Sequence, residues 1–257
     1  MSYRIFLQLI RRDMQVFKKV YLGKLFDISL TFVIWVLVFG YFVPKMGTEA
    51  NYGLFIMVGA IASFGIFDLI GQSGTMINDI QGNRTISYLL MLPISSRFVF
   101  CYAAVSWAIQ SFLLALPLYF AGKALFWTQF NLHNITWYKL GVVFITVNMF
   151  FGFFALWIVS VLHKVSDLSR IYFRFLNPLF IFGCYFYTWR VAYEISPWIG
   201  YVSLIDPFCY VMEISRAALM GQSGYIPFWA SFCALWTFII IFGLHATARL
   251  KRLLDCL

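Results

Sequence analysis

The chain has 257 residues, of which 62% are hydrophobic and 11% charged, and its formal net charge is +9. Soluble domains are about 45–50% apolar and about 25% charged, so this composition excludes a soluble globular protein and indicates an integral membrane protein. The length allows about six membrane spans with short loops and no separate soluble domain, so we expect a single all-α transmembrane domain over residues 1–257.

Residues 1–24 predict an amphipathic helix that lies in the membrane interface. At 100° per residue, the apolar side chains of residues 3–21 cover about half of the helix, and Arg, Lys and Gln side chains cover most of the other half. Asp13 is the one charged residue on the apolar side. A helix with a cationic face and no soluble core to pack against should lie along the membrane surface rather than cross it.

Six apolar segments follow, each long enough to cross a bilayer as a helix. Their expected bounds are 25–43, 52–70, 98–121, 138–162, 172–189 and 226–248. Two of the connections, 71–97 and 190–225, are longer than ordinary loops between spans. We therefore expect these two connections to carry most of the function.

The basic residues are distributed unevenly over the connections. With the N-terminus inside the cell, 14 of the 19 Lys and Arg residues lie on the inner side. The five on the outer side are Lys45, Lys123, Lys139, Arg190 and Arg216. The positive-inside rule thus places both termini in the cytoplasm, and this topology explains the net charge of +9 better than a nucleic-acid partner does.

The sequence contains no catalytic or metal-binding motif. The phosphate-binding pattern GxxxxGK[ST] is absent, as are HExxH and GxSxG, so we expect no enzyme activity, no cofactor and no metal in this chain. The five cysteines are scattered without a CxxC pair, and we interpret them as small apolar residues rather than as a disulfide framework.

Two carboxylates, Asp27 and Asp68, lie near the inner ends of the first two spans. An ionisable residue at membrane depth is a functional candidate by default. Because both are close to the interface, we interpret them instead as solvated or paired with nearby basic residues. No ladder of Asp, Glu and His continues through the spans, which argues against a proton-driven pump.

The two long connections contain motifs. The inner one ends in TISYLLMLPISSRFVF, a leucine-rich segment followed by Pro-Ile-Ser, and the outer one contains DPFCYVMEISRAALMG. In this order and spacing they resemble the membrane subunits of ABC-2 class ATP-binding-cassette exporters, whose outer motif is Asn-Pro-x-x-Tyr-x-x-Glu-x-x-Arg with a following Gly. The matching residues are Leu89, Leu90, Pro93, Ile94, Ser95, Pro207, Tyr210, Glu213, Arg216 and Gly221. Asp206 stands where the family usually has Asn, and Ser87 where it often has Glu.

This resemblance implies a six-span permease driven by a separate ATPase. The segment around 74–91 would be a coupling helix seated in a groove of that ATPase, although a solvated loop is the alternative. The implied contact residues are Asp79, Gln81, Asn83, Arg84 and Thr85. Two copies of the ATPase would bind ATP and Mg²⁺, and this chain would form a homodimer or a pseudo-symmetric heterodimer in a bacterial inner membrane.

Aromatic residues make up 21% of the chain and could line a transport pathway. The candidates nearest the expected dimer interface are Phe32, Trp35, Phe39, Phe175, Phe182 and Phe186. We favour export of a hydrophobic or lipid-like substrate, and export of a lipid-linked polysaccharide is an open alternative. An ATP-independent channel or secondary transporter is a further alternative, but it would need facing polar residues at mid-membrane, and these are scarce.

The outer motif predicts a capped helix of about 14 residues, too short to span the membrane. Asp206 is expected to cap its N-terminus, Pro207 to take its first position and Gly221 to suit its C-terminal cap. Glu213 and Arg216 are three residues apart and are expected to pair. The face expected to enter the membrane carries Phe208, Val211, Met212 and Leu219. With residues 190–200, this helix would form a re-entrant hairpin on the outer side, acting either as a gate or as a structural plug.

Overall fold

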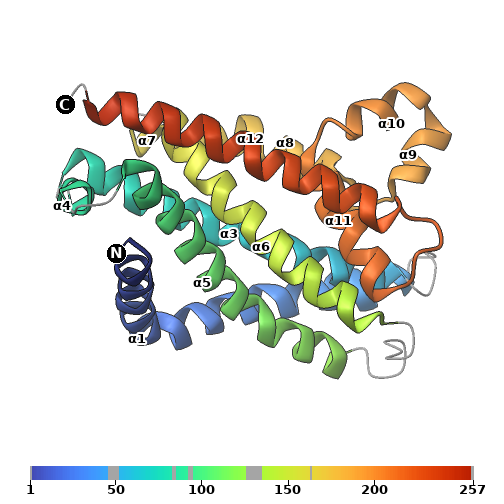
Figure 1. The fold of residues 1–257 in the computed structure, drawn as a ribbon. Helices are drawn as coiled ribbons and strands as arrows, with labels where there is room; N and C mark the ends of the chain where they lie inside the picture. Colours follow the sequence, from blue (N-terminus) through green and yellow to red (C-terminus); the bar gives the residue numbers. More distant parts are fainter. Residues whose placement is uncertain are drawn as a thin grey trace.

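The computed structural model describes residues 2–45, 52–82, 85–91, 95–125, 135–162 and 164–255. These residues form helices and connections, with no strand among them (Figure 1). Five of the described helical segments are long and apolar enough to cross a membrane: Arg4–Phe42, Tyr52–Gln81, Ser96–Leu125, Trp137–Val161 and Phe228–Leu253. The chain is therefore an all-helical, multi-pass membrane protein.

The helices follow one another along the chain, with several short π-helical turns (η) between them. In order they are α1 Ser2–Leu37, η1 Val38–Phe42, α2 Val43–Lys45, α3 Tyr52–Gln81, α4 Thr85–Leu90, α5 Ser96–Leu125, α6 Trp137–Val161, α7 Ser166–Ile171, η3 Tyr172–Leu176, α8 Asn177–Phe180, η4 Ile181–Tyr185, α9 Trp189–Ile195, α10 Pro197–Ser203, α11 Pro207–Leu219 and α12 Phe228–Asp255.

Helices α3 and α6 form the centre of the bundle. In their most apolar stretches 76% and 72% of the residues are buried inside the protein, against 11% for α1 and 28% for α12. Helix α6 packs on α3, α5, α11 and α12, and rings of α6 such as Phe150 and Phe154 are fully buried. Because α1 and α12 keep large apolar side chains on the surface, they are the helices that can face lipid or another copy of the chain.

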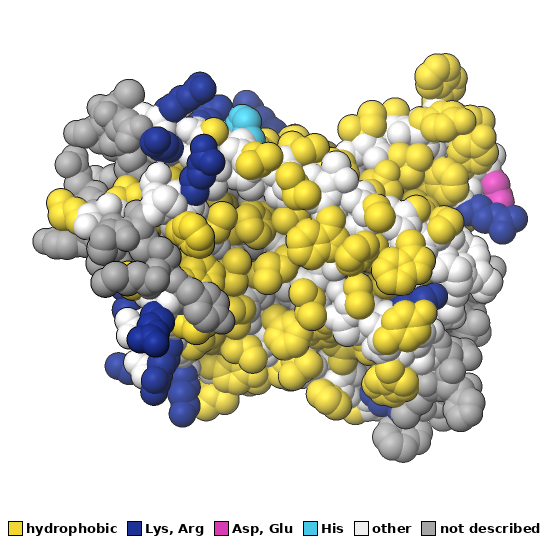
Figure 2. All heavy atoms as spheres, viewed as in Figure 1, with side chains coloured by type: hydrophobic (Ala, Val, Ile, Leu, Met, Phe, Trp, Pro, Cys, Tyr) yellow, Lys and Arg dark blue, Asp and Glu magenta, His cyan; other side chains and the backbone are white. Residues whose placement is uncertain are grey.

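The charged side chains gather at the ends of the molecule. Both termini lie at the same end, and the short helices α9 and α10 lie at the opposite end (Figure 1). In the face shown in Figure 2, a broad apolar band separates clusters of Lys and Arg near the termini from a few charges near α9 and α10. This distribution is typical of a membrane protein, whose apolar belt contacts the lipid chains.

Helix α1 joins the two segments that the sequence divided at residue 24. It is helical throughout from Ser2 to Leu37, so the predicted interfacial helix and the predicted first span are joined without a loop between them. Gly23 is the weakest helix former at the expected boundary, and no proline is present there to end the helix. The first turns nevertheless run across the direction of the rest of α1 (Figure 1).

The second span is longer than predicted, because α3 continues to Gln81 rather than ending near residue 70. The first part of the expected 71–97 loop is therefore helix. Its polar residues differ in their surroundings, since Thr75, Asn78 and Gln81 are exposed. Ser73 is fully buried, and its Oγ donates to the carbonyl of Ala155 at 3.4 Å. A hydroxyl that bonds a neighbouring carbonyl can sit inside a helical bundle without loss of backbone hydrogen bonds.

The stretch expected to be the fifth span, 172–189, is interrupted. A run of helical turns extends from Ser166 to Tyr185 with two π-helical turns in it, and the run ends at Gly183 and Cys184, where the backbone is no longer helical. Cys184 has a left-handed φ of 61°. The predicted end at residue 189 is wrong, because Trp189 already begins α9.

Gly152 on α6 allows close packing against α5. A Cβ atom at this position would lie 2.3 Å from the carbonyl oxygen of Ala104, whereas a Cβ at Gly141 on the same helix meets nothing within 4 Å. We expect Gly152→Ala to separate the two helices and, at a cost of about 2 kcal/mol, to lower the Tm by roughly 5 °C. Gly141→Ala should leave the Tm unchanged or slightly higher. Differential scanning fluorimetry in detergent measures both variants, and equal Tm values would contradict the close contact.

Candidate functional site

Helix α11 has the caps that the sequence predicts. Asp206 takes the N-cap position, and its Oδ1 accepts the backbone N–H of Phe208 at 2.9 Å. Pro207 is the first helical residue, where its missing N–H costs nothing. The helix ends at Leu219, and Gly221 two residues later has a φ of 101°, a conformation that favours glycine. The hydroxyl of Tyr210 donates to the carbonyl of Leu204 at 2.9 Å and ties α11 to the end of α10.

Helix α11 is buried on nearly all sides. The face expected to enter the membrane is wrong: Phe208, Val211 and Met212 are 0% exposed and Leu219 is 3% exposed, all inside the protein. The helix packs against α3, α6, α12 and η4. It is therefore a central packing element at the end of the bundle opposite the termini, and the polar side chains it carries are enclosed.

Glu213 binds backbone groups of two other segments. Its Oε1 accepts the N–H of Trp189, at the start of α9, at 3.0 Å. Its Oε2 accepts the N–H of Ile226, just before α12, at 2.9 Å. The side chain is 0% exposed, so both hydrogen bonds replace those that water would otherwise make. Glu213 thus fixes the positions of two connections relative to α11.

Arg216 binds carbonyl groups at the irregular end of η4 and just after it. Its guanidinium donates to the carbonyls of Cys184 and Tyr185, both at 2.6 Å, and to that of Tyr187 at 3.4 Å. It also stacks on the ring of Phe55 of α3, with Cζ 3.5 Å from the ring centroid. Arg216 is 0% exposed, and burial lowers its pKa to about 10, so it keeps its charge at neutral pH.

The predicted pairing of Glu213 with Arg216 is wrong. Both residues are described, and the ion pairs of the described chain include none between them. Each charge is instead satisfied by backbone groups of other segments, carbonyls for Arg216 and N–H groups for Glu213. Backbone that has left helical geometry offers unpaired donors and acceptors, and these compete successfully with a side chain on the next turn.

The two carboxyl groups of this site are held in a region that disfavours their charge. Burial raises the pKa of Asp206 to about 7, and its Oδ2 has no hydrogen-bond partner. Burial also raises the pKa of Glu213, although the N–H groups of Trp189 and Ile226 and the charge of Arg216 oppose this effect. Both groups lie outside the five long helices.

An aromatic groove lies beside this site. It has a volume of about 230 Å³ between α1, α3 and the α8–η4 run, and its lining includes Phe32, Trp35, Phe180 and Tyr185. The ring of Trp35 lies edge-on to that of Tyr185 with centroids 5.8 Å apart, and Trp35 stacks on Phe39 at 5.2 Å. Tyr185 belongs to both features, since its carbonyl accepts from Arg216 and its side chain lines the groove.

The six predicted pathway aromatics divide into two groups. Phe32 and Trp35 line the groove, and Phe39 and Phe186 pack beside it with centroids 5.8 Å apart. Phe175 instead lies against Trp157 of α6, and Phe182 is 62% exposed on the surface. The structure therefore brings four of the six together. Asp27 also lines the groove with an exposed side chain.

The predicted ATPase-contact residues lie at the other end of α3. The Oδ2 of Asp79 accepts the N–H of Ile86 at 2.9 Å, so Asp79 holds the short helix α4 against the end of α3. Gln81 is the last residue of α3 and is exposed. Asn83, Arg84 and the side chain of Thr85 lie outside the described residues. The described residues of the segment 74–91 thus belong mainly to two helices, the end of α3 and α4.

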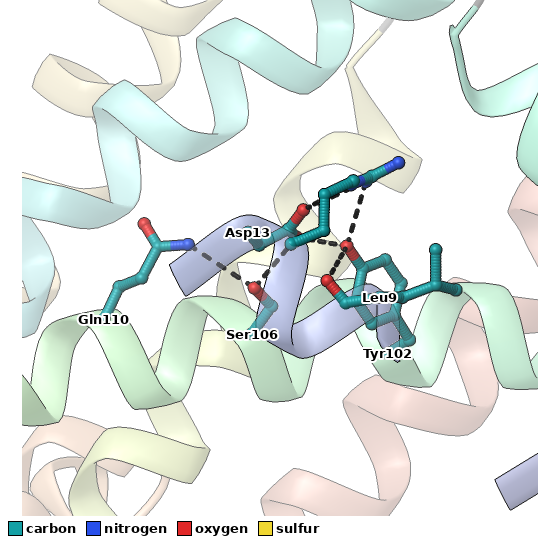
Figure 3. A network of polar contacts seen from close by, with 6 residues as sticks. Leu9, Asp13, Tyr102, Ser106 and Gln110 are labelled. Carbon is teal, nitrogen blue, oxygen red and sulfur yellow. Dashed lines mark hydrogen bonds and ion pairs between the residues drawn. The ribbon is translucent and has the colours of Figure 1, made fainter. Parts of the chain in front are cut away.

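A polar cluster between α1 and α5 was not predicted. Asp13 points at α5, where its Oδ2 accepts from the hydroxyls of Tyr102 and of Ser106, the latter at 3.1 Å (Figure 3). Arg12 donates to Oδ1 of Asp13 at 2.9 Å and to the Tyr102 hydroxyl at 3.2 Å. The signal was present in the sequence, because Asp13 is the residue that breaks the apolar face of residues 3–21.

The cluster continues from α5 to α3. Gln110 donates to Ser106 at 3.4 Å and accepts from Gln72 at 3.0 Å, and Gln72 also donates to Asp68 at 3.2 Å. Lys24 of α1 pairs with Asp68 at 2.9 Å. This ion pair confirms, for Asp68, the interpretation of a carboxylate paired with a nearby basic residue. No group of three His, Cys, Asp or Glu residues in the described chain is arranged to hold a metal ion.

The comparison with protein families decides the identity of the chain. The model of the ABC-2 type transporter family, ABC2_membrane, matches residues 4–220, which include α1 to α11. The chain belongs to the ABC-2 type transporter family. No curated protein sequence matches it. Members of this family are membrane permeases of ABC transporters, and they normally pair with an ABC ATPase subunit.

For this ABC-2 protein, the buried Arg216 should matter far more for stability than an exposed arginine nearby. Arg216→Met leaves the carbonyls of Cys184 and Tyr185 buried without donors. We expect a loss of about 3 kcal/mol or more, which is roughly 6 °C in Tm. The control is Arg190→Met, which breaks a pair with Glu194 that is 68% and 61% exposed and should shift the Tm by about 1 °C. Similar Tm values for the two variants would contradict the role of Arg216.

Asp206 should make the stability of the ABC-2 protein depend on pH. Because its folded pKa is raised to about 7, the stability that the protonated carboxyl allows is lost as the pH rises toward and through 7. Asp206→Asn keeps a capping oxygen without a charge. We expect its Tm to exceed that of the unmodified protein by a few degrees at pH 8, and the difference to shrink at pH 5. A difference that is constant between these pH values would show that Asp206 is not titrating.

Proposed function

We propose that this ABC-2 protein is the permease of an exporter that moves a hydrophobic or lipid-like substrate out of the cytoplasm or the inner leaflet of a bacterial inner membrane. Two copies of a separate ATPase would bind ATP and Mg²⁺, and two copies of this chain would form the membrane part. The observation that carries the proposal is Tyr185, which connects the aromatic groove to the carbonyl groups held by Arg216.

In this proposal the chain crosses the membrane six times with both termini in the cytoplasm. The helical run Ser166–Tyr185 is the additional span, and at 1.5 Å per residue its length of roughly 30 Å matches the hydrocarbon core. The Lys and Arg side chains near the two termini support this orientation, because positive charge is retained on the cytoplasmic side (Figure 2). The first turns of α1 lie in the inner interface.

Helix α3 is proposed to transmit motion between the two ends of the molecule. Phe55 near its outer end stacks on Arg216, and Asp79 near its inner end holds α4. The helix is continuous over 30 residues, roughly 45 Å, and most of its apolar stretch is buried. A movement imposed on α4 and the following connection by the ATPase would therefore reach the Arg216 site through one rigid element. Helices α9, α10 and α11 would form the outer gate.

The aromatic groove is proposed to take up the substrate. Residues of α1 line one side of it, and apolar side chains of the same helix, such as Phe26 and Leu30, are exposed on the protein surface, where they could contact lipid. Apolar walls with a few polar groups suit a molecule that partitions into the bilayer. A long hydrophilic polymer would find few polar partners on these walls, and for this reason we favour the lipid-like substrate over the polysaccharide.

Transport in reconstituted vesicles tests the proposal. The permease and its ATPase are placed in proteoliposomes that contain a fluorescent phospholipid analogue, and its movement between leaflets is followed with and without ATP. We expect ATP-dependent movement that falls several-fold in Trp35→Ala, which removes an aromatic wall of the groove. Phe182→Ala is the matched control, since Phe182 is 62% exposed and outside the groove. Movement that is unchanged without ATP would contradict an ATP-driven exporter, and equal losses in both variants would contradict the groove.

A further inference from the structure

We propose that Cys184 and Cys209 form a disulfide bond on the outer side of the membrane. The bond would link the two residues that flank the segment containing the short helices α9 and α10. The inference does not depend on the transported substrate. It depends on the geometry of the two thiols and on the proposed orientation, in which this end of the molecule faces the oxidising compartment. It also replaces the interpretation of these two cysteines as small apolar residues.

The two sulfur atoms are already in contact. The Sγ atoms of Cys184 and Cys209 are 3.2 Å apart although the residues are separated by 25 positions in the chain. Both side chains are 0% exposed. Bonded sulfurs lie about 2 Å apart, so a movement of roughly 1 Å within the two side chains brings them to bonding distance. Helix packing alone would not require two thiols to face each other here.

The pair sits where the chain leaves the bundle and where it returns. Cys184 lies in the non-helical end of η4, and Cys209 lies in the first turn of α11. Between them, α9 and α10 carry exposed apolar side chains such as Ile195, Trp198 and Val202. A covalent bond between the two cysteines would therefore join the two ends of the α9–α10 segment.

Noncovalent contacts already join α11 to the start of the α9–α10 segment. Arg216 binds the carbonyl of Cys184 itself at 2.6 Å, and Glu213 binds the N–H of Trp189 at 3.0 Å. Both contacts join α11 to the segment 184–189, as the disulfide would. The backbone is thus already held so that the two sulfurs meet, which reduces the distortion that a bond would otherwise impose.

The chemistry requires an oxidant of the thiol–disulfide class at the outer face. Cys184 and Cys209 together give up two protons and two electrons, one sulfur–sulfur bond forms, and the disulfide of the oxidant is reduced to two thiols. Oxidation has to occur during folding, because both sulfurs are enclosed afterwards. The contact with Cys184, burial and nearby carboxyl groups raise the pKa of the Cys209 thiol, so the folded reduced pair would react slowly.

The redox state of the thiols in the cell tests the proposal. Cells are quenched with acid, and the denatured protein is alkylated with N-ethylmaleimide, reduced, and alkylated again with the deuterated reagent before peptide mass spectrometry. We expect Cys184 and Cys209 to carry the second label, and Cys101 and Cys233, which lie on α5 and α12, to carry the first. First-label alkylation of both Cys184 and Cys209 in the unmodified protein would overturn the proposal.

Two variants sharpen this test. In Cys209→Ser, Cys184 should change to the first label because its partner is gone, whereas the control Cys101→Ser/Cys233→Ser should leave the pair oxidised. The Tm of Cys184→Ser/Cys209→Ser should be lower than that of the control by roughly 5 °C, because the link restricts the unfolded chain. Cys184 that still carries the second label in Cys209→Ser would show a different partner and would also overturn the assignment. These readouts do not require transport, so failure of the export assay leaves them unaffected.

Discussion

The buried guanidinium of Arg216 is the constraint around which the end of the molecule opposite the termini is organised. A charge with no access to water must be surrounded by acceptors, and an intact helix has none to offer because its carbonyls are already bonded. The end of η4 supplies them: its backbone leaves helical geometry at Gly183 and Cys184, and the carbonyls of Cys184 and Tyr185 become free to bind Arg216. The non-helical backbone thus provides acceptors for the buried charge, and the guanidinium provides donors for carbonyls that would otherwise be buried without hydrogen bonds.

Several features at the end of the molecule opposite the termini follow from this arrangement. Because Arg216 is occupied by carbonyls, Glu213 is available to bind the N–H groups of Trp189 and Ile226. The two side chains together fix two connections around α11, residues 184–189 and the segment just before α12. Phe55 covers the guanidinium and brings α3 into the same cluster. Tyr185, whose carbonyl is one of the acceptors, turns its side chain into the aromatic groove. A change in the backbone at Cys184 and Tyr185 would thus alter the lining of the aromatic groove directly.

A second set of polar side chains, on α1, α3 and α5, bonds to other side chains instead of to backbone. Asp13, Ser106, Gln110, Gln72 and Asp68 form one connected series across α1, α5 and α3. Polar groups in contact with lipid chains would lose their hydrogen bonds, so they gather between helices and satisfy one another. The first turns of α1 are in this way attached to the bundle by specific contacts as well as by apolar packing.

The sequence by itself determined the membrane class, the approximate positions of the apolar helices, the family resemblance and the caps of α11, because composition, hydrophobic runs and capping residues act locally. It did not determine where α3 ends, since a helix continues until packing or a breaker stops it and no proline is present near residue 70. Only the tertiary structure decided that Glu213 and Arg216 bind backbone rather than each other, that Asp13 faces Tyr102, and that Cys184 meets Cys209. These contacts join residues far apart in the chain, and their partners are backbone groups or side chains whose positions are fixed only when the helices pack.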